Sequence, residues 1–192
     1  MPLAEAASKV EERLRLPAET FGRPVLVLIS GLPGSGKSYF ARRLADRVRA
    51  VVIETDFVRK TIYSKPRYTA RESLFVYRVS HYLIKRLLER GYRVIFDATN
   101  LLERKREELY HIAEQAEAKL VIVRVVAPED VIRQRLESRQ LQRSPEDLSE
   151  ATWAVYERMK KTEEPIRPSH LVVDTSRDLA GPLDKVSREV RN

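Results

Sequence analysis

The chain has no cysteine, only three histidines and no long apolar run. Without cysteine there can be neither a disulfide nor a thiolate metal site. The histidines are far apart in sequence, at His81, His111 and His170, which argues against a catalytic metal held by a histidine pair. No apolar segment approaches the length of a membrane span, and the first residues lack the apolar core of a signal peptide. These absences favour a cytoplasmic protein.

What the chain does have is an excess of positive charge. Its 192 residues carry a formal net charge of +8 at pH 7. This length predicts a single domain over residues 1–192, with an N-terminal helix and connector over residues 1–24. A positive field favours anionic partners. A nucleoside triphosphate alone would be such a partner, so the charge is compatible with nucleic acid but does not require it.

One stretch has the pattern of a phosphate-binding loop between a strand and a helix. An apolar run at 25–29 predicts a strand buried on both faces, and a run with helical spacing extends to Val48. Between them, the eight residues from Gly31 to Ser38 match G-x-x-x-x-G-K-[ST]. Glycines let backbone N–H groups converge on a phosphate, Lys37 can reach the β- and γ-phosphates, and the Ser38 hydroxyl can bind Mg²⁺. We therefore expect a nucleoside-triphosphate site rather than a structural turn.

Apolar strands alternate with helices along the whole chain. Strands are expected at 25–29, 51–54, 92–97, 120–126 and 170–173, and further helices at 3–15, 56–64, 69–90, about 102–117, 128 to about 142, 144–162 and 183–190. This alternation predicts an α/β sandwich with a parallel sheet. Ligands bind at the carboxyl ends of such strands. The glycine loop, Asp56, Asp97, Pro128 and Asp174 fall there.

Two carboxylates in these positions are candidates for chemistry. Asp97 ends an apolar strand, so it could hold the Mg²⁺ shell, although a turn or a helix cap is the alternative. Asp56 and Arg59 share one face at the start of a helix. The carboxylate could accept a proton from a substrate hydroxyl while the guanidinium binds a phosphate. A helix cap beside a solvated surface charge would show the same spacing.

The helix after Pro128 is rich in arginine. Arg135 and Arg139 are four residues apart and face the same way. An arginine-bearing flap that closes over the triphosphate would neutralise charge that develops during phosphoryl transfer. A solvated basic helix face is the alternative.

Taken together, these motifs resemble a family of P-loop kinases. The segments GLPGSGKS, Asp56 to Arg59, VIFDATN and Arg135 to Arg139 are similar, in order and spacing, to the kinase domain of phage polynucleotide 5′-kinase. Zeta-toxin-like and AAA_33-type small P-loop kinases are relatives. The resemblance spans about residues 25–161. It implies a three-layer sandwich with a five-stranded parallel sheet in the order 2-3-1-4-5, a helical arginine-bearing lid at about 128–162, and transfer of the γ-phosphoryl group of ATP to a hydroxyl.

The resemblance also implies roles for individual residues. It makes Asp56 the general base and Arg59 a contact to an acceptor phosphate, and Ser38 and Asp97 would hold Mg²⁺. The residues expected to be catalytic are Lys37, Asp56, Arg59, Arg135 and Arg139. Those expected to bind ATP are Gly31, Pro33, Gly34, Ser35, Gly36, Lys37, Ser38, Tyr39, Arg139 and Thr175.

The acceptor is the open question at this point. Polynucleotide kinases often have a second acidic residue directly after the base, where this chain has Phe57. Residues 57–72 interleave basic side chains with aromatic ones, as single-stranded nucleic acid prefers. We expect the 5′-hydroxyl end of a polynucleotide, with a small metabolite, nucleotide-sugar or antibiotic hydroxyl as the alternative. A non-catalytic ATP-binding module is a third reading.

Overall fold

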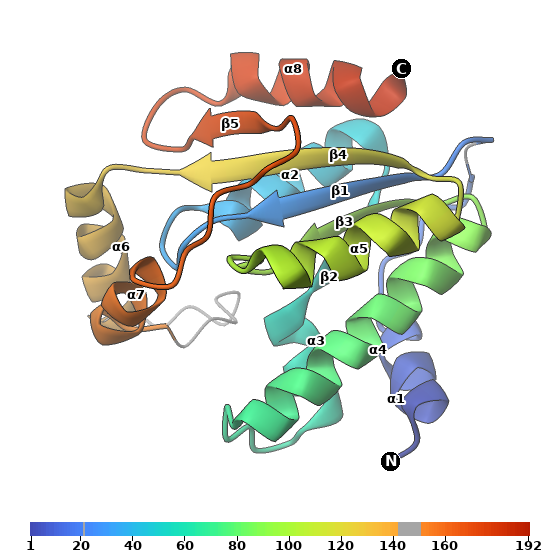
Figure 1. Cartoon of the computed structure of the whole chain (residues 1–192), viewed down its shortest axis with the longest axis horizontal. Helices are drawn as coiled ribbons and strands as arrows, with labels where there is room; N and C mark the ends of the chain where they lie inside the picture. Colours follow the sequence, from blue (N-terminus) through green and yellow to red (C-terminus); the bar gives the residue numbers. More distant parts are fainter. Residues whose placement is uncertain (21, 142–150) are drawn as a thin grey trace.

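The computed structural model describes residues 1–20, 22–141 and 151–192, and its centre is a parallel five-stranded sheet. The strands are β1 (Val25–Ser30), β2 (Val51–Glu54), β3 (Arg93–Asp97), β4 (Lys119–Val126) and β5 (Leu171–Asp174). They lie in the order β2-β3-β1-β4-β5 (Figure 1), which confirms the expected order 2-3-1-4-5. The most central strand is therefore the one that leads into the glycine loop.

Strand β1 is buried along its full length, as its apolar sequence predicts. Its alternate side chains enter different hydrophobic clusters, with Leu26 and Leu28 on one face of the sheet. Val27 and Ile29 point into the cluster on the other face. The sheet is thus the middle layer of three.

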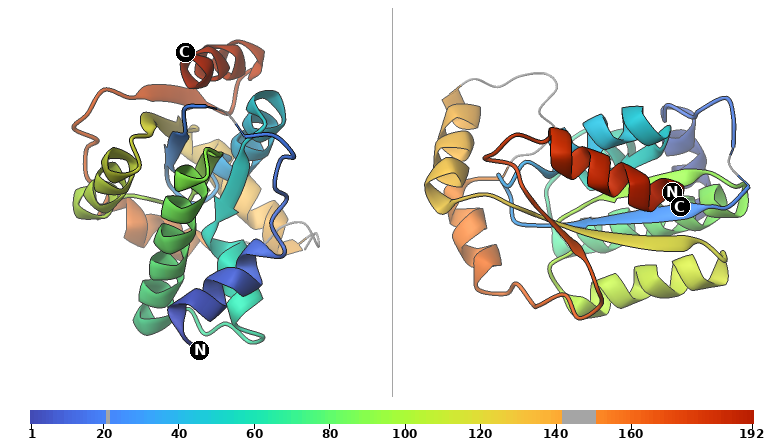
Figure 2. Two further views of the ribbon diagram at one scale, coloured as in Figure 1. Left: turned by 90° about the vertical axis from the view of Figure 1, so that its right-hand side faces the viewer. Right: turned by 90° about the horizontal axis from the view of Figure 1, so that it is seen from above.

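Helices cover both faces of this sheet and also its carboxyl end. Helices α1 (Leu3–Glu11), α3 (Thr55–Ile62), α4 (Ala70–Glu89) and α5 (Glu103–Gln115) contribute to the cluster that contains Leu26. Helices α2 (Lys37–Val48) and α8 (Ala180–Arg191) cover the opposite face. Helices α6 (Glu129–Leu141) and α7 (Trp153–Lys160) lie beyond the carboxyl ends of β1 and β4 (Figure 1). The two chain ends lie on opposite sides of the sheet (Figure 2).

The α6–α7 pair has a hydrophobic cluster of its own. Ile132 and Leu136 from α6 pack with Tyr156 from α7, and Trp153 stacks on Tyr156 with 4.6 Å between ring centroids. Leu32 of the glycine loop packs against the same cluster. The two helices are therefore held against the loop by apolar contacts.

Several element boundaries differ from those expected. The predicted continuous helix over 144–162 is wrong at residues 151–152, which are not helical, because α7 begins at Trp153, where Thr152 Oγ1 accepts a hydrogen bond from the Val155 N–H. The sequence 144–147, expected to begin that helix, lies outside the described residues. Helix α8 begins at Ala180 rather than 183, since Pro182 falls in the first turn, which does not need its N–H. Helix α1 ends at Glu11 rather than 15.

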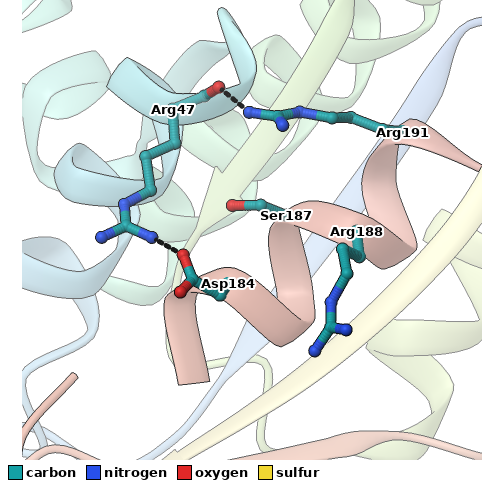
Figure 3. Close-up of a pocket in the computed structure, with 5 residues that line it drawn as sticks. All are labelled: Arg47, Asp184, Ser187, Arg188 and Arg191. Atoms are coloured by element: carbon teal, nitrogen blue, oxygen red, sulfur yellow. Dashed lines mark hydrogen bonds and ion pairs between the residues drawn. The ribbon is translucent and has the colours of Figure 1, made fainter. Parts of the chain in front are cut away.

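Polar contacts join helix α8 to helix α2. Arg47 forms an ion pair with Asp184, and Arg191 donates to the Arg47 carbonyl oxygen at 2.7 Å (Figure 3). These residues line a cavity of about 720 Å³ together with Ser187 and Arg188. None of the predicted site residues lies there.

No helix in the described part of the chain is long and apolar enough to cross a membrane. This agrees with the lack of long apolar runs in the sequence.

Arg106 on α5 is the largest fully buried side chain among the described residues. Its guanidinium lies 2.5 Å from the Glu103 carboxylate. It also donates to the backbone carbonyls of Asn100, Leu101, Glu164 and Pro165. One side chain therefore ties the loop after β3 to the segment between α7 and β5.

We expect Arg106→Ala to lower the free energy of unfolding by about 3–5 kcal/mol, because it leaves the buried Glu103 carboxylate and several carbonyls without a partner. Chemical denaturation measures this loss. Arg104→Ala, an exposed site on the same helix, is the matched control and should change stability by no more than about 0.5 kcal/mol. Equal effects of the two substitutions would contradict the bridging role.

Candidate active site

The glycine loop runs from the end of β1 to the start of α2 and passes very close to neighbouring backbone. A Cβ at Gly31 would lie 2.3 Å from the Val125 carbonyl oxygen of β4. Gly36 has a φ of +88°, and a Cβ there would lie 2.8 Å from Thr175 Oγ1. Gly31 is therefore required because a Cβ would collide with the backbone. Gly36 is required both because a Cβ would press on Thr175 and because its φ is positive.

The loop after β3 holds the glycine loop by hydrogen bonds. The Gly31 N–H donates to the Thr99 carbonyl at 3.1 Å. The Asn100 side chain donates to the Ile29 carbonyl at 2.7 Å. Helix α5 begins at Glu103. Its N-cap residue is Leu102, whose side chain forms no capping hydrogen bond. Asn100 thus fixes the central strand where the phosphate loop begins.

Lys37, Ser38 and Asp97 form the polar centre of the site. Burial lowers the pKa of the Lys37 ammonium, and the nearby carboxylates of Asp97 and Asp56 oppose this shift. Lys37 Nζ donates to the Leu32 carbonyl at 2.9 Å, which holds it back on its own loop.

Asp97 is only 2% exposed, and burial raises the pKa of its carboxyl group, with Lys37 opposing the shift. The Ser38 hydroxyl hydrogen-bonds to the carboxylate, but Oδ2 has no hydrogen-bond partner within the described structure. A buried oxygen without a partner beside a serine hydroxyl fits the oxygen ligands that Mg²⁺ prefers.

A cavity of about 700 Å³ gathers most of the predicted catalytic residues. Its lining includes Pro33, Gly34, Gly36, Lys37, Ser38, Tyr39, Asp56, Arg59, Asp97 and Arg139. The structure thus brings together side chains from the glycine loop, from the start of α3, from the end of β3 and from α6.

Asp56 and Arg59 lie next to each other in this cavity. Burial raises the pKa of the Asp56 carboxyl group, and the Arg59 charge opposes the shift. Arg59 is 6% exposed and donates to Ser73 Oγ at 3.1 Å. Its Nε atom has no hydrogen-bond partner among the described residues, although the guanidinium carbon lies 4.7 Å from the centre of the Tyr68 ring. Arg59 is therefore a buried cation whose Nε–H donor has no partner within the described structure.

Glu72 organises the residues around Arg59. Its carboxylate accepts from the N–H groups of Arg67, at 2.9 Å, and Tyr68, at 2.8 Å. It also lies 3.5 Å from the Arg59 guanidinium. The Glu72 N–H donates to Thr69 Oγ1, the N-cap hydrogen bond of α4. The T-x-x-E spacing at this helix start is visible in the sequence, but it does not reveal the contact between Glu72 and Arg59.

A second cavity, of about 830 Å³, adjoins the other side of the glycine loop. Arg135 lies here and donates to Thr175 Oγ1 at 2.8 Å and to the Thr175 carbonyl at 2.9 Å. Thr175 in turn donates to the Ser35 carbonyl at 2.6 Å. The structure therefore separates the two predicted lid arginines, because Arg139 lines both cavities and Arg135 lines only this one.

Some lining residues had no recognisable sequence pattern. Helix α7 contributes Val155, Arg158 and Met159 to the 700 Å³ cavity, and α4 contributes Tyr77. Their proximity depends on how distant helices pack, which spacing does not reveal. By contrast Phe57, from the predicted aromatic series, packs against the core rather than facing either cavity.

A parallel sheet with β1 at its centre, followed directly by a glycine loop and a helix, defines a P-loop kinase fold. The sequence model of the AAA_33 family, described as an AAA domain, matches residues 26–166. Since this is most of the chain, the protein belongs to the AAA_33 family. The expected relationship to small P-loop kinases is thereby confirmed, while the particular resemblance to polynucleotide kinase stays a prediction.

The chain is similar to the L-seryl-tRNA(Sec) kinase of Methanococcus maripaludis, with 28% identity over 116 residues. The alignment covers 58% of this chain and 44% of that protein, so the chain spans less than half of its relative. Kti12 of Chaetomium thermophilum, solved with ADP-AlF3, has a TM-score of 0.71 at 20% identity over 86% of this chain and 97% of its own.

The APS kinase CysC of Mycobacterium tuberculosis, solved with AMPPNP and APS, has a TM-score of 0.68 at 18% identity, over 88% of this chain and 99% of its own. At such low identities these two likenesses show the shared fold.

We expect Gly36→Ala to weaken binding of an ATP analogue by about tenfold or more, since a left-handed conformation costs a residue with a Cβ about 1–2 kcal/mol and the new methyl would also press on Thr175 Oγ1. Isothermal titration calorimetry measures the affinity. Gly181→Ala is the matched control, because no heavy atom lies within 4 Å of its added Cβ. The close approach would be irrelevant to binding if both variants kept the parental affinity.

Proposed function

We propose that this protein is a kinase that transfers the γ-phosphoryl group of ATP to a hydroxyl of an acceptor bound beside Arg59. The observation that carries this proposal is the shared cavity of Lys37, Asp56, Arg59 and Asp97. A phosphate loop alone would serve a binding module, but the partly buried Asp56 carboxylate and the buried Arg59 cation facing the same space are what an acceptor hydroxyl with an attached anion requires.

In the proposed complex, the triphosphate lies along the glycine loop between the two cavities. Arg139 lines both of them, so it is the residue suited to contact the phosphates where they cross. The nucleoside would occupy the 830 Å³ cavity beside Thr175. Ser38 and Asp97 would hold Mg²⁺, which neutralises charge on the phosphates; the partnerless Asp97 Oδ2 supports this assignment.

Arg135 has a different role in the proposed complex from the one first expected of it. Its guanidinium is already bonded to Thr175 and to the Gly34 carbonyl. We therefore assign it to holding α6 against the loop and to shaping the nucleoside cavity, and leave direct phosphate contact to Arg139.

Asp56 is the proposed general base. As the acceptor oxygen bonds to the γ-phosphorus, the bond from that phosphorus to the β–γ bridging oxygen breaks and ADP leaves. The hydroxyl proton passes to the Asp56 carboxylate. Burial raises the pKa of this group and the Arg59 charge opposes the rise, so the carboxylate is a stronger base than a solvated aspartate.

The acceptor is proposed to be the 5′-hydroxyl end of a polynucleotide. Such an end carries its first phosphate a short distance from the hydroxyl, which suits the spare Nε donor of Arg59, and its base could stack against Tyr68. The relative named as a seryl-tRNA kinase is also named for an acceptor carried on RNA. A small phosphorylated metabolite is the second candidate, because a 700 Å³ cavity is of the size that small ligands fill.

The test of the kinase proposal is a transfer assay with γ-labelled ATP and Mg²⁺ that sets 5′-hydroxyl oligonucleotides beside pooled metabolites. We expect label to reach an acceptor with the parental protein and not with Lys37→Ala, which removes the contact to the β- and γ-phosphates. Lys185→Ala, an exposed lysine on α8, controls for the loss of one charge. Normal turnover by a folded Lys37→Ala protein would contradict the kinase proposal.

We expect Asp56→Asn to lower kcat by about 10² to 10⁴ with little change in ATP affinity. A carboxylate accepts a proton only when ionised, so the parental rate should fall as the pH drops through the raised pKa of Asp56. The variant should lose this acid limb. The structure places Asp56 in the first turn of α3 behind the N-cap residue Glu54. If Asp56 served only the positive end of that helix, its substitution would change stability by at most about 1 kcal/mol and leave the pH profile of kcat intact.

A further inference from the structure

A second groove lies beside the acceptor cavity, on the far side of the loop that carries Tyr68. It is formed by the end of α3, residues 63–69 and the first turns of α4, and has a volume of about 720 Å³. Its lining includes Ile62, Tyr63, Arg67, Arg71, Phe75 and Arg78. None of these residues lines either cavity of the candidate active site, so the groove, called here the α4 groove, is a separate feature.

We propose that the α4 groove binds the sugar–phosphate chain of a single-stranded polynucleotide behind its 5′ end. This inference rests on the proposed function and extends it, because it assigns a place to the part of the acceptor that does not react. A mononucleotide or a small metabolite would have no use for the groove.

The charge of the groove favours a polyanion. Within the described structure, the guanidinium groups of Arg67, Arg71 and Arg78 have neither an ion pair nor a hydrogen bond, and all three side chains are exposed. Arg71 and Arg78 are seven residues apart on α4, which places them about two turns apart on one face. The one carboxylate in the lining, Glu72, is already committed to Arg59 and to two backbone N–H groups.

The groove also has apolar and aromatic surface between these charges. Tyr63 and Phe75 are partly buried in the wall, and Leu74 is 56% exposed between Arg71 and Arg78. Guanidinium groups beside aromatic and apolar faces are the combination that holds a single strand, with phosphates on the cations and bases against the rings. A free inorganic anion would need only the charges.

The groove and the acceptor cavity share one wall. Thr69 and Glu72 line the groove, whereas the adjacent Tyr68 and Ser73 line the cavity. Hydrogen bonds fix both sides of this wall: the Tyr68 N–H donates to the Glu72 carboxylate, and the Glu72 N–H donates to Thr69 Oγ1. A strand whose first phosphate lies on Arg59 can therefore cross the loop at Tyr68 and continue into the groove.

The test compares two acceptors that both carry a 5′-hydroxyl: a single strand of about ten nucleotides and a nucleoside 3′-monophosphate. The variant is Arg71→Ala/Arg78→Ala. The matched control is Lys185→Ala/Arg188→Ala, which removes two exposed positive charges from α8 on the other face of the sheet. Each protein is assayed for kcat and KM between about 50 and 200 mM salt. Fluorescence anisotropy of the 3′-labelled strand gives affinity independently of turnover.

For the oligonucleotide, we expect the groove variant to raise KM at least about fivefold and to flatten the salt dependence by about one unit of slope per lost phosphate contact. Its KM for the monophosphate and its kcat should stay within twofold of the parental values. The α8 control should match the parent in both respects.

Other outcomes would refute binding of the strand in the α4 groove and leave the kinase proposal unaffected. Equal KM values of the parent for the two acceptors, or equal losses in the groove variant and the α8 control, would show that the groove does not bind the strand. If no 5′-hydroxyl acceptor is phosphorylated, the proposed acceptor fails, and anisotropy then decides whether the groove holds a polynucleotide at all. Anisotropy that is indifferent to Arg71 and Arg78 would refute the inference.

Discussion

The arrangement of this protein depends on how closely the glycine loop approaches its neighbours. The loop lies against the carbonyl of Val125 and the side chain of Thr175 with no space for a Cβ at Gly31 or Gly36. These contacts come from β4 and from the residue after β5, so the site exists only when the strands on that side of the sheet are in register. The order of the strands and the shape of the glycine loop therefore depend on each other, because the residues that the loop packs against belong to strands far from it in sequence.

The same region contains charged side chains whose polar atoms are buried without hydrogen-bond partners. Arg59 and Asp97 are buried and Lys37 is partly buried, yet Asp97 Oδ2 and Arg59 Nε have no hydrogen-bond partner among the described residues. Elsewhere, the equally buried Arg106 has its donors paired with a carboxylate and four carbonyls. Buried groups left without partners in a cavity are costly to stability and available to a ligand.

The sequence predicted those parts of the fold that depend on local pattern. The apolar run of β1 and the loop that follows it indicated the glycine loop, strand ends indicated Asp56 and Asp97, and the structure places residues of all three in the lining of one cavity. The bond between Arg135 and Thr175 could not be predicted, because it joins residues forty apart whose proximity depends on how α6 packs. The lining of the cavity by α7 was hidden for the same reason.

The residues proposed to contact the acceptor come from one uninterrupted piece of chain. Asp56, Arg59, Tyr68, Glu72 and Ser73 all lie within residues 56–73, directly after β2. Strand β2 is at the margin of the sheet and pairs only with β3. Substitutions within residues 56–73 would therefore leave the central strand and the cavity beside Thr175 in place, so the proposed acceptor preference can change while the glycine loop is kept.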